Sequence, residues 1–213
     1  MKLEHLGRYL WAKKICGELD VARVADIACA TGYGCSILAQ EAEQVVGIDR
    51  SYQYLEKAPK IENVTYVCKN LDTMEADIYE SFFDMIVCFE TIEHVKYPER
   101  LIQSFSKMLN KNGTLLLSFP NSCYEKVDEN GENADIYHLH VFQKEEVEKW
   151  LKMNGFEILN CLGQSYCNLR CQAEYDALKA GRIATEELEK EHECTLSNCS
   201  GRQMRVLFQR LMM

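Results

Sequence analysis

The residues best suited to chemistry lie in the stretch FETIEH, residues 89–94, directly after the apolar run FDMIVC. If residues 90–94 form a helical turn, Glu90, Glu93 and His94 share one face, because positions i, i+3 and i+4 of a helix are neighbours. An imidazole with a pKa near ~6.5 is a suitable general base for a hydroxyl group. Two carboxylates and an imidazole are equally suitable ligands for a divalent cation.

Two more histidines follow a later apolar run, NGTLLLSFP. Glu90, Glu93 and His94 can bind a divalent cation, especially with His138 or His140 as a fourth ligand, and the choice depends on where these two side chains point. Without a metal, the candidate catalytic residues are His94, Glu93 and His138. A third interpretation stays open: Glu90 contacts a cofactor or acceptor, Glu93 pairs locally, and His94 satisfies a hydrogen bond of the fold.

A second motif, DIACATGYG at residues 26–34, stands between an apolar run and a helical segment. Glycine in such a turn lets the backbone approach a ligand, and the helix start offers unpaired N–H groups. The next apolar run, VVGID, ends in Asp49, an acid that can accept both ribose hydroxyls of a nucleoside cofactor. A nicotinamide enzyme would need G-x-G-x-x-G, which this turn lacks. The alternative is a turn without a ligand, with Asp49 or Ser51 capping the following helix.

The elements that must position these motifs alternate along the chain. Apolar runs predict strands, and helical periodicity with Gly or Pro at the ends predicts helices between them. The pattern is typical of a Rossmann-like, doubly wound α/β fold, which we predict as a seven-stranded, mostly parallel sheet with an antiparallel C-terminal strand. Ligands of such sheets bind beyond the carboxyl ends of the strands. The predicted strands are 21–30, 44–49, 63–68, 82–89, 112–120, 156–162 and 203–211, and the predicted helices are 4–16, 35–43, 51–59, 98–109 and 142–156.

The composition fits a single domain over residues 1–213. With 47% hydrophobic residues, the chain is long enough to bury one core. The polar and strongly charged residues 163–201 predict a helical insertion or lid, because a structureless loop of that length is unusual. Together with residues 120–140, it would close over a substrate.

Charge, hydropathy and cysteine usage exclude several classes of function. A net charge of -9 and a pI of 5.2 argue against nucleic-acid binding, which needs clustered Lys and Arg. No stretch approaches the ~20 apolar residues of a membrane span, and the N-terminus lacks the apolar core of a signal peptide. The 11 cysteines, an odd number, favour free thiols in a reducing compartment, so we predict a cytoplasmic protein. The cysteines that could in principle hold zinc are more widely spaced than usual: Cys167, Cys171, Cys194 and Cys199.

Taken in order, the motifs resemble those of the class I S-adenosylmethionine-dependent methyltransferases. FDMIVCFETIEHV, NGTLLLSFPN and YHLHVFQKEEVEKWLKMNGFEI are similar to successive signatures of small-molecule and glycan O-methyltransferases, and the likeness covers residues 4–162. The family's first motif reads D-x-G-x-G-x-G-x-G, so Gly32 and Gly34 are kept while Ala28 and Ala30 replace glycine. The resemblance implies S-adenosyl-L-methionine as cofactor and, as its binding residues, Arg8, Tyr9, Asp26, Ala28, Ala30, Gly32, Gly34, Asp49, Arg50, Asn70, Leu71 and Glu90.

The resemblance also bears on the N-terminus and on FETIEH. EHLGRYLWA is similar to the N-terminal helix of the glycan-associated branch, which implies that Arg8 and Tyr9 lie over the cofactor, with Arg8 near its carboxylate. The E-x-x-E-H pattern resembles metal ligands of ubiquinone-pathway O-methyltransferases and of the methyltransferases that cap the 3′-terminal 2′-hydroxyl of small RNAs. The metal ligands implied here are Glu90, Glu93, His94 and His138.

We therefore predict an S-adenosylmethionine-dependent methyltransferase that modifies a hydroxyl of a small metabolite or sugar. Tyr124, Tyr137 and Tyr166 are candidates for lining the site of this small-molecule or glycan acceptor. The alternatives are an RNA 2′-O-methyltransferase, which the acidic charge disfavours, and a cofactor-binding module without catalysis and with a regulatory role, consistent with Ala28 and Ala30. A nicotinamide-dependent dehydrogenase is a third alternative.

Overall fold

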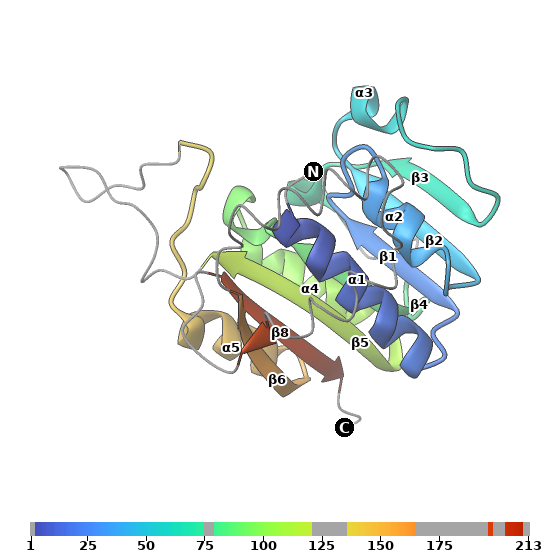
Figure 1. Ribbon diagram of the computed structural model, residues 1–213. Coiled ribbons are helices and arrows are strands. Elements are labelled where there is room, and N and C mark those ends of the chain that lie inside the picture. Colours follow the sequence, from blue (N-terminus) through green and yellow to red (C-terminus); the bar gives the residue numbers. More distant parts are fainter. Residues whose placement is uncertain (1–2, 75–78, 121–135, 165–195, 198–202, 211–213) are drawn as a thin grey trace.

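One sheet runs through the part of the chain that the computed structural model describes, which is residues 3–74, 79–120, 136–164, 196–197 and 203–210. Its strands are β1 (Arg23–Ile27), β2 (Gln44–Asp49), β3 (Val64–Cys68), β4 (Phe83–Phe89), β5 (Leu109–Pro120), β6 (Phe156–Gln164), β7 (Leu196–Ser197) and β8 (Gln203–Arg210). They lie in the order β3-β2-β1-β4-β5-β8-β6-β7 (Figure 1).

The strands β1 to β5 form a parallel block, and β8 runs antiparallel to both of its neighbours, β5 and β6. The predicted Rossmann-like α/β fold with a mostly parallel sheet is confirmed. The predicted number of seven strands is wrong, because the described residues form eight. The additional strand, β7, has only two residues, which is too short for any alternation of apolar and polar side chains to reveal it.

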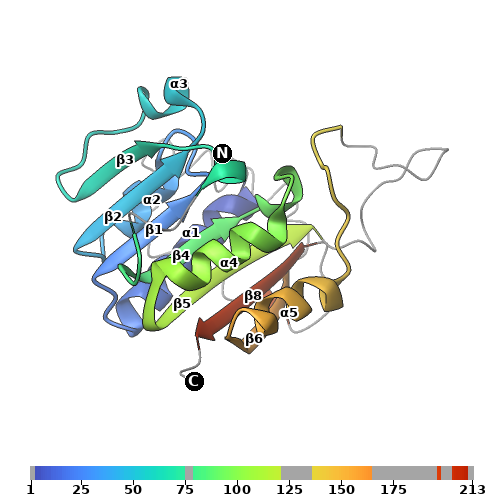
Figure 2. The same ribbon diagram turned by 180° about the vertical axis from the view of Figure 1, so that it is seen from behind.

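Helices cover both faces of the sheet (Figures 1 and 2). The helices α1 (Leu3–Glu18) and α2 (Tyr33–Leu38) lie on one face, and α4 (Pro98–Met108) and α5 (Lys144–Met153) lie on the other. Consecutive residues of β4 alternate between the two faces, as the period of a strand requires. Met85 and Val87 pack with α1 and α2, whereas Ile86 and Cys88 pack with α4 and α5.

The helix α4 shows how the sequence builds one of these layers. Pro98 occupies the start of the helix, where its missing N–H costs nothing. The apolar residues that follow at helical spacing are all buried against the sheet: Leu101, Ile102, Phe105 and Met108. Shorter elements complete the described fold: the helix α3 (Tyr52–Leu55) and the 3-10 turns η1 (Leu71–Thr73) and η3 (Ile92–His94).

The predicted helical insertion or lid at 163–201 lies almost entirely outside the described residues, so it and the single-domain organisation stay predictions. Residues 163–164 end β6, and residues 196–197 form β7. Among the helices that the structure describes, none has the length and apolar character needed to cross a membrane.

Candidate functional site

The turn after β1 has the backbone of a ligand-approach loop. Ala28 and Ala30 adopt φ values of 58° and 49°, and Gly32 has a φ of 74°. Because of these left-handed values, β1 ends at Ile27, whereas the predicted strand 21–30 continued to residue 30. A Cβ on Gly32 would overlap the Tyr66 hydroxyl, and one on Gly34 would overlap the Tyr9 ring, so only glycine fits at these two positions.

Asp26, at the end of β1, lies beneath this turn and is fully buried. Its Oδ1 accepts a hydrogen bond from the Tyr9 hydroxyl (2.8 Å), and its Oδ2 accepts one from the Cys35 thiol (3.2 Å). Burial raises the pKa of Asp26 to about 7, against the lowering effect of these two bonds. Asp26 therefore joins α1 and α2 to β1 from below the turn.

Asp49, at the end of β2, fixes the upper part of the turn. Its Oδ2 accepts from the backbone N–H of Ala30 (2.9 Å), and its Oδ1 accepts from that of Ser51 (2.8 Å). Each carboxylate oxygen has a second lone pair, so Asp49 can still accept bonds from a ligand. The exposed Arg50 follows directly in the chain.

The end of β3 reaches the same edge of the sheet. The N–H of Lys69 donates to the carbonyl of Asp49 (2.9 Å), which brings Asn70 and Leu71 next to the end of β2. The side chain of Asn70 accepts from the N–H of Asp72 (3.0 Å) and thereby starts η1. The structure thus places the predicted donor-side residues, from the β1 turn to Leu71, along one edge.

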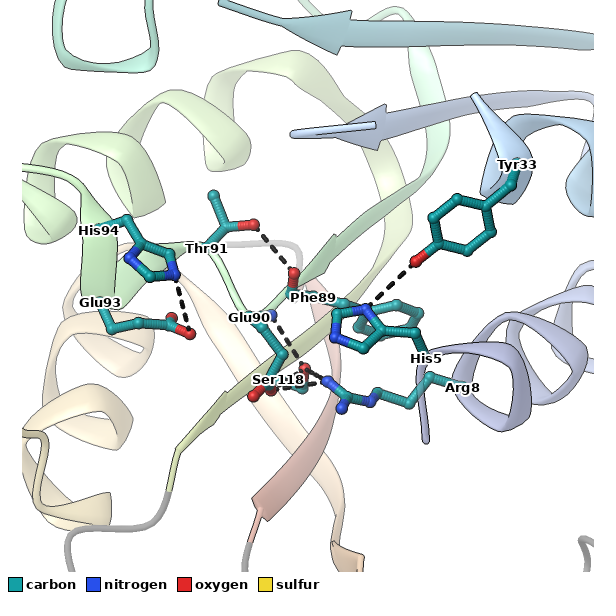
Figure 3. Close-up of polar contacts among 9 residues, drawn as sticks. All are labelled: His5, Arg8, Tyr33, Phe89, Glu90, Thr91, Glu93, His94 and Ser118. Atoms are coloured by element: carbon teal, nitrogen blue, oxygen red, sulfur yellow. Dashed lines mark hydrogen bonds and ion pairs between the residues drawn. The ribbon is translucent and has the colours of Figure 1, made fainter. Parts of the chain in front are cut away.

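A buried ion pair lies at the end of β4 (Figure 3). Arg8 is 0% exposed, and its Nη1 lies 2.8 Å from Oε1 of Glu90 and 3.1 Å from Oγ of Ser118. The Ser118 hydroxyl in turn donates to Oε1 of Glu90 (2.7 Å). Arg8 therefore contacts a carboxylate of this chain, whereas the resemblance implied a cofactor carboxylate as its neighbour.

The predicted helical turn over residues 90–94 does not form as a whole. Glu90 has a left-handed φ of 49°, Thr91 is not helical, and only Ile92–His94 form the 3-10 turn η3. The side chain of Glu90 consequently points to Arg8 and not to the face that carries Glu93 and His94 (Figure 3). Of the four predicted metal ligands, the structure brings three together and leaves Glu90 out.

These three residues form a compact cluster. One ligand atom each from Glu93, His94 and His138 lies within 4.8 Å of the others. The Glu93 side chain is 1% exposed, and its Oε1 lies 3.8 Å from Nε2 of His94. Nδ1 of His94 donates to the carbonyl of Tyr137 (2.7 Å), so its Nε2 is the nitrogen that faces the cluster. A histidine that ligates a metal commonly donates its other N–H in this way, and so does a histidine base.

The histidine strap, which we define as residues 136–142, runs alongside η3. The N–H of Leu139 donates to the carbonyl of Glu93 (2.8 Å). His140 donates from Nε2 to the carbonyl of Val95 (2.9 Å) and stacks on Phe142. The sequence left open whether His138 or His140 completes the cluster, and the structure brings His138 to it.

Sequence reasoning missed Ser118, although a serine within the apolar run LLLSFP was a detectable signal. It also missed the contact between His5 and Tyr33, whose Nδ1 and hydroxyl lie 3.2 Å apart (Figure 3). Among the predicted acceptor-lining tyrosines, Tyr137 is 73% exposed, and Tyr124 and Tyr166 lie outside the described residues.

A comparison with known protein families identifies the family of this chain. Residues 3–160 match the family described as a methyltransferase domain. The chain belongs to this family, the class I S-adenosylmethionine-dependent methyltransferases. The predicted enzyme class is confirmed, and S-adenosyl-L-methionine is the cofactor of this family.

Individual relatives of this methyltransferase are distant. It is 24% identical over 162 residues to the ubiquinone biosynthesis O-methyltransferase of Coxiella burnetii, covering 69% of this chain and 68% of that protein. A structure of an S-adenosylmethionine-dependent methyltransferase from Listeria monocytogenes superposes with a TM-score of 0.69 at 15% identity, over 99% of both chains. The N-methyltransferase NodS from Bradyrhizobium japonicum, in complex with S-adenosyl-L-homocysteine, superposes with a TM-score of 0.60 at 14% identity, over 95% of this chain and 86% of that one. Because these similar proteins include both an O- and an N-methyltransferase, the fold alone does not identify the atom that accepts the methyl group.

Proposed function

We propose that this methyltransferase transfers the methyl group of S-adenosyl-L-methionine to a hydroxyl of a small molecule. The observation that carries the proposal is the cluster of His94, His138 and the buried Glu93 at the carboxyl end of β4. Nitrogen acceptors that are neutral amines need no strong base, whereas a hydroxyl must lose its proton as the methyl group arrives. The name of the Coxiella burnetii relative, an O-methyltransferase, supports the same acceptor atom.

The donor would lie along the edge formed by residues 28–34, Asp49, Asn70 and Leu71. The left-handed turn allows a close approach of the ligand to the backbone, and the Asp49 carboxylate can accept the ribose hydroxyls. Gly32 and Gly34 are packed beneath this edge by the Tyr66 and Tyr9 rings. The remaining predicted cofactor residues contribute through this packing and through the Arg8–Glu90 pair: Arg8, Tyr9, Asp26 and Glu90.

In the reaction, the acceptor oxygen attacks the methyl carbon, the bond between that carbon and the sulfonium sulfur breaks, and the acceptor proton moves to a base. His94 is the proposed base, because the Tyr137 carbonyl holds its Nδ1–H and leaves Nε2 to accept the proton. The carboxylate of Glu93, 3.8 Å away, stabilises the imidazolium that forms. His138 completes the wall of the acceptor site, and holding acceptor and methyl group in line supplies much of the acceleration.

The same cluster supports a second proposal, a divalent cation held by Glu93, His94 and His138. One carboxylate and two imidazoles match the ligand preference of transition metals more closely than that of Mg²⁺. When bound, a cation would lower the pKa of the acceptor hydroxyl and orient it. Glu90 is not part of this revised ligand set, because its carboxylate is ion-paired with Arg8.

The finer predictions on partners and location are also proposals. We infer a small-molecule or glycan acceptor, because the net charge of -9 opposes the counterion release that an RNA acceptor would require. The described cysteines are free thiols, which supports the reducing environment of the cytoplasm.

Transfer from methyl-labelled S-adenosyl-L-methionine to a panel of hydroxylated aromatic compounds, sugars and RNA tests the function. We expect turnover with one of the first two classes, and methylation of RNA alone would overturn the small-molecule proposal. Binding of the donor without transfer to any of the acceptors would favour the regulatory module. Binding of a nicotinamide cofactor in its place would favour the dehydrogenase.

Substitutions at the cluster separate the base from the metal. Glu93→Gln and His94→Asn should each lower kcat by about 100-fold or more, while the Kd for S-adenosyl-L-methionine stays within about twofold. A chelator that abolishes turnover, with recovery on adding a divalent cation, would establish the metal. Turnover that resists the chelator but is lost in His94→Asn would establish the base, and unchanged turnover in both variants would overturn both roles.

A further inference from the structure

Ser118 is a polar residue in a place that favours an apolar one. It lies in β5 between Leu117 and Phe119, and it is 0% exposed. A buried hydroxyl is costly unless it is hydrogen-bonded, so its presence in an apolar run indicates that its bonds matter.

The hydroxyl of Ser118 is hydrogen-bonded to Arg8 and Glu90 (Figure 3). The hydroxyl accepts from Nη1 of Arg8 (3.1 Å) and from the backbone N–H of Glu90 (3.2 Å), and it donates to Oε1 of Glu90 (2.7 Å). The Ser118 carbonyl also accepts from the N–H of Glu90 (3.0 Å). One residue thus binds both the side chain and the backbone of Glu90.

Glu90 has a backbone conformation that needs such support. Its φ of 49° is rare for a residue with a Cβ and persists only where surrounding contacts enforce it. This conformation sets the direction in which the chain leaves β4. The chain then passes through Thr91 into η3, which carries Glu93 and His94.

The group of Arg8, Glu90 and Ser118 lies between the two halves of the site. Figure 3 shows His5 and Tyr33, from α1 and α2, on one side of it, and Glu93 and His94 on the other. Arg8 belongs to α1, whose Tyr9 bonds to Asp26 beneath the β1 turn. A substitution of Ser118 would therefore alter the positions of residues on both sides of this group.

We propose that Ser118 is a positioning residue for methyl transfer. Its hydroxyl fixes the charged pair of Arg8 and Glu90 and holds Glu90 in its left-handed conformation, so that α1 and the acceptor turn, residues 90–95, keep one relative arrangement. The proposal rests on the proposed function, because it assigns the donor and the acceptor to the two sides of this group.

Two variants test the role of the hydroxyl. Ser118→Ala removes it, and Ser118→Cys keeps nearly the same shape with much weaker hydrogen bonding, so it remains informative if the alanine variant does not fold. In both we expect hydrogen exchange of the amides of residues 90–94 to quicken by about tenfold or more, the factor that a hydrogen bond to a charged group corresponds to. By calorimetry, the Kd for S-adenosyl-L-homocysteine should rise by about the same factor.

Amides of β1 and β2 and the variant Thr114→Val are the controls. Thr114 is another buried hydroxyl residue on β5, further from the carboxyl end, and its loss should leave both readouts as in the unmodified protein. Acceleration that is equal at residues 90–94 and at β1 would indicate a general loss of stability and overturn the proposal. So would an unchanged Kd in a folded Ser118→Ala. If the unmodified protein does not bind S-adenosyl-L-homocysteine, the proposed function fails, while the exchange comparison still decides whether Ser118 holds the turn.

Discussion

At the scale of single residues, two alanines hold a conformation that favours glycine. Ala28 and Ala30 have left-handed φ values in the turn that the family builds with glycines. Such a value costs an L residue about 1–2 kcal/mol. The chain therefore stores strain in the loop where the donor is proposed to bind.

Replacing one of these alanines tests that strain. Ala30→Gly should raise the free energy of unfolding by roughly 0.5–1 kcal/mol, because relief of the strain exceeds the added entropy of the unfolded chain. Chemical denaturation measures the change. In the control Ala39→Gly, at a φ of -64°, nothing is relieved, and stability should fall by about 0.5–1 kcal/mol. A fall in stability for Ala30→Gly as well would contradict the strain.

Asp26 gives the stability a dependence on pH. Burial raises its pKa to about 7, so between about pH 4 and pH 7 the folded state holds a proton that the unfolded state has lost. This contribution is present at low pH and is lost as the pH rises, by up to about 1.4 kcal/mol for each pH unit crossed. Asp26→Asn should remove this slope.

The measurement is urea denaturation of both proteins at pH 5 and pH 8. The variant should gain stability relative to the unmodified protein at pH 8, and the gain should shrink at pH 5. The difference between the two proteins isolates Asp26 from other titrating groups. A gain of the same size at both pH values would refute the raised pKa.

At the scale of elements, several hydrogen bonds hold the histidine strap to η3 and Val95, among them that of the Leu139 N–H to Glu93 and that of His94 to the Tyr137 carbonyl. His140 bonds to the carbonyl of Val95 and stacks on Phe142, while its neighbours Leu139 and Val141 have exposed side chains. The bond of His140 to Val95 therefore adds to the bonds that flank His138 and helps to keep His138 in the cluster.

His140→Ala should loosen the strap without unfolding the protein. We expect faster amide exchange at residues 137–141 and a kcat reduced by about tenfold, the effect of losing one partly buried hydrogen bond on a positioned group. Val141→Ala removes an exposed side chain and serves as the control. Unchanged exchange in His140→Ala would show that other contacts hold the strap.

At the scale of the whole molecule, the sequence predicted the parallel block well, because fully buried strands such as FDMIVCF are continuous apolar runs. It also predicted that Asp49, Asn70 and His94 lie at or after the carboxyl ends of β2, β3 and β4, since this follows from parallel topology alone. The orientation of Glu90 could not be predicted, because nothing in a glutamate signals a positive φ. The choice between His138 and His140 depended on hydrogen bonds to Tyr137 and Val95, which no periodicity encodes.

The sheet is closed by a strand that comes late in the chain. In the described structure, β8 is inserted between β5 and β6, and its Arg205 lies opposite Ser118. During synthesis, β5 and β6 would leave the ribosome before β8. Because they do not pair with each other, each would have an unpaired edge until β8 is made. Pairing between segments so distant in sequence is slow. A nascent chain would thus form the β1 turn early, whereas the pairing of β8 with β5 next to Ser118 would form last. The ability to transfer a methyl group should therefore be the final property to emerge during folding.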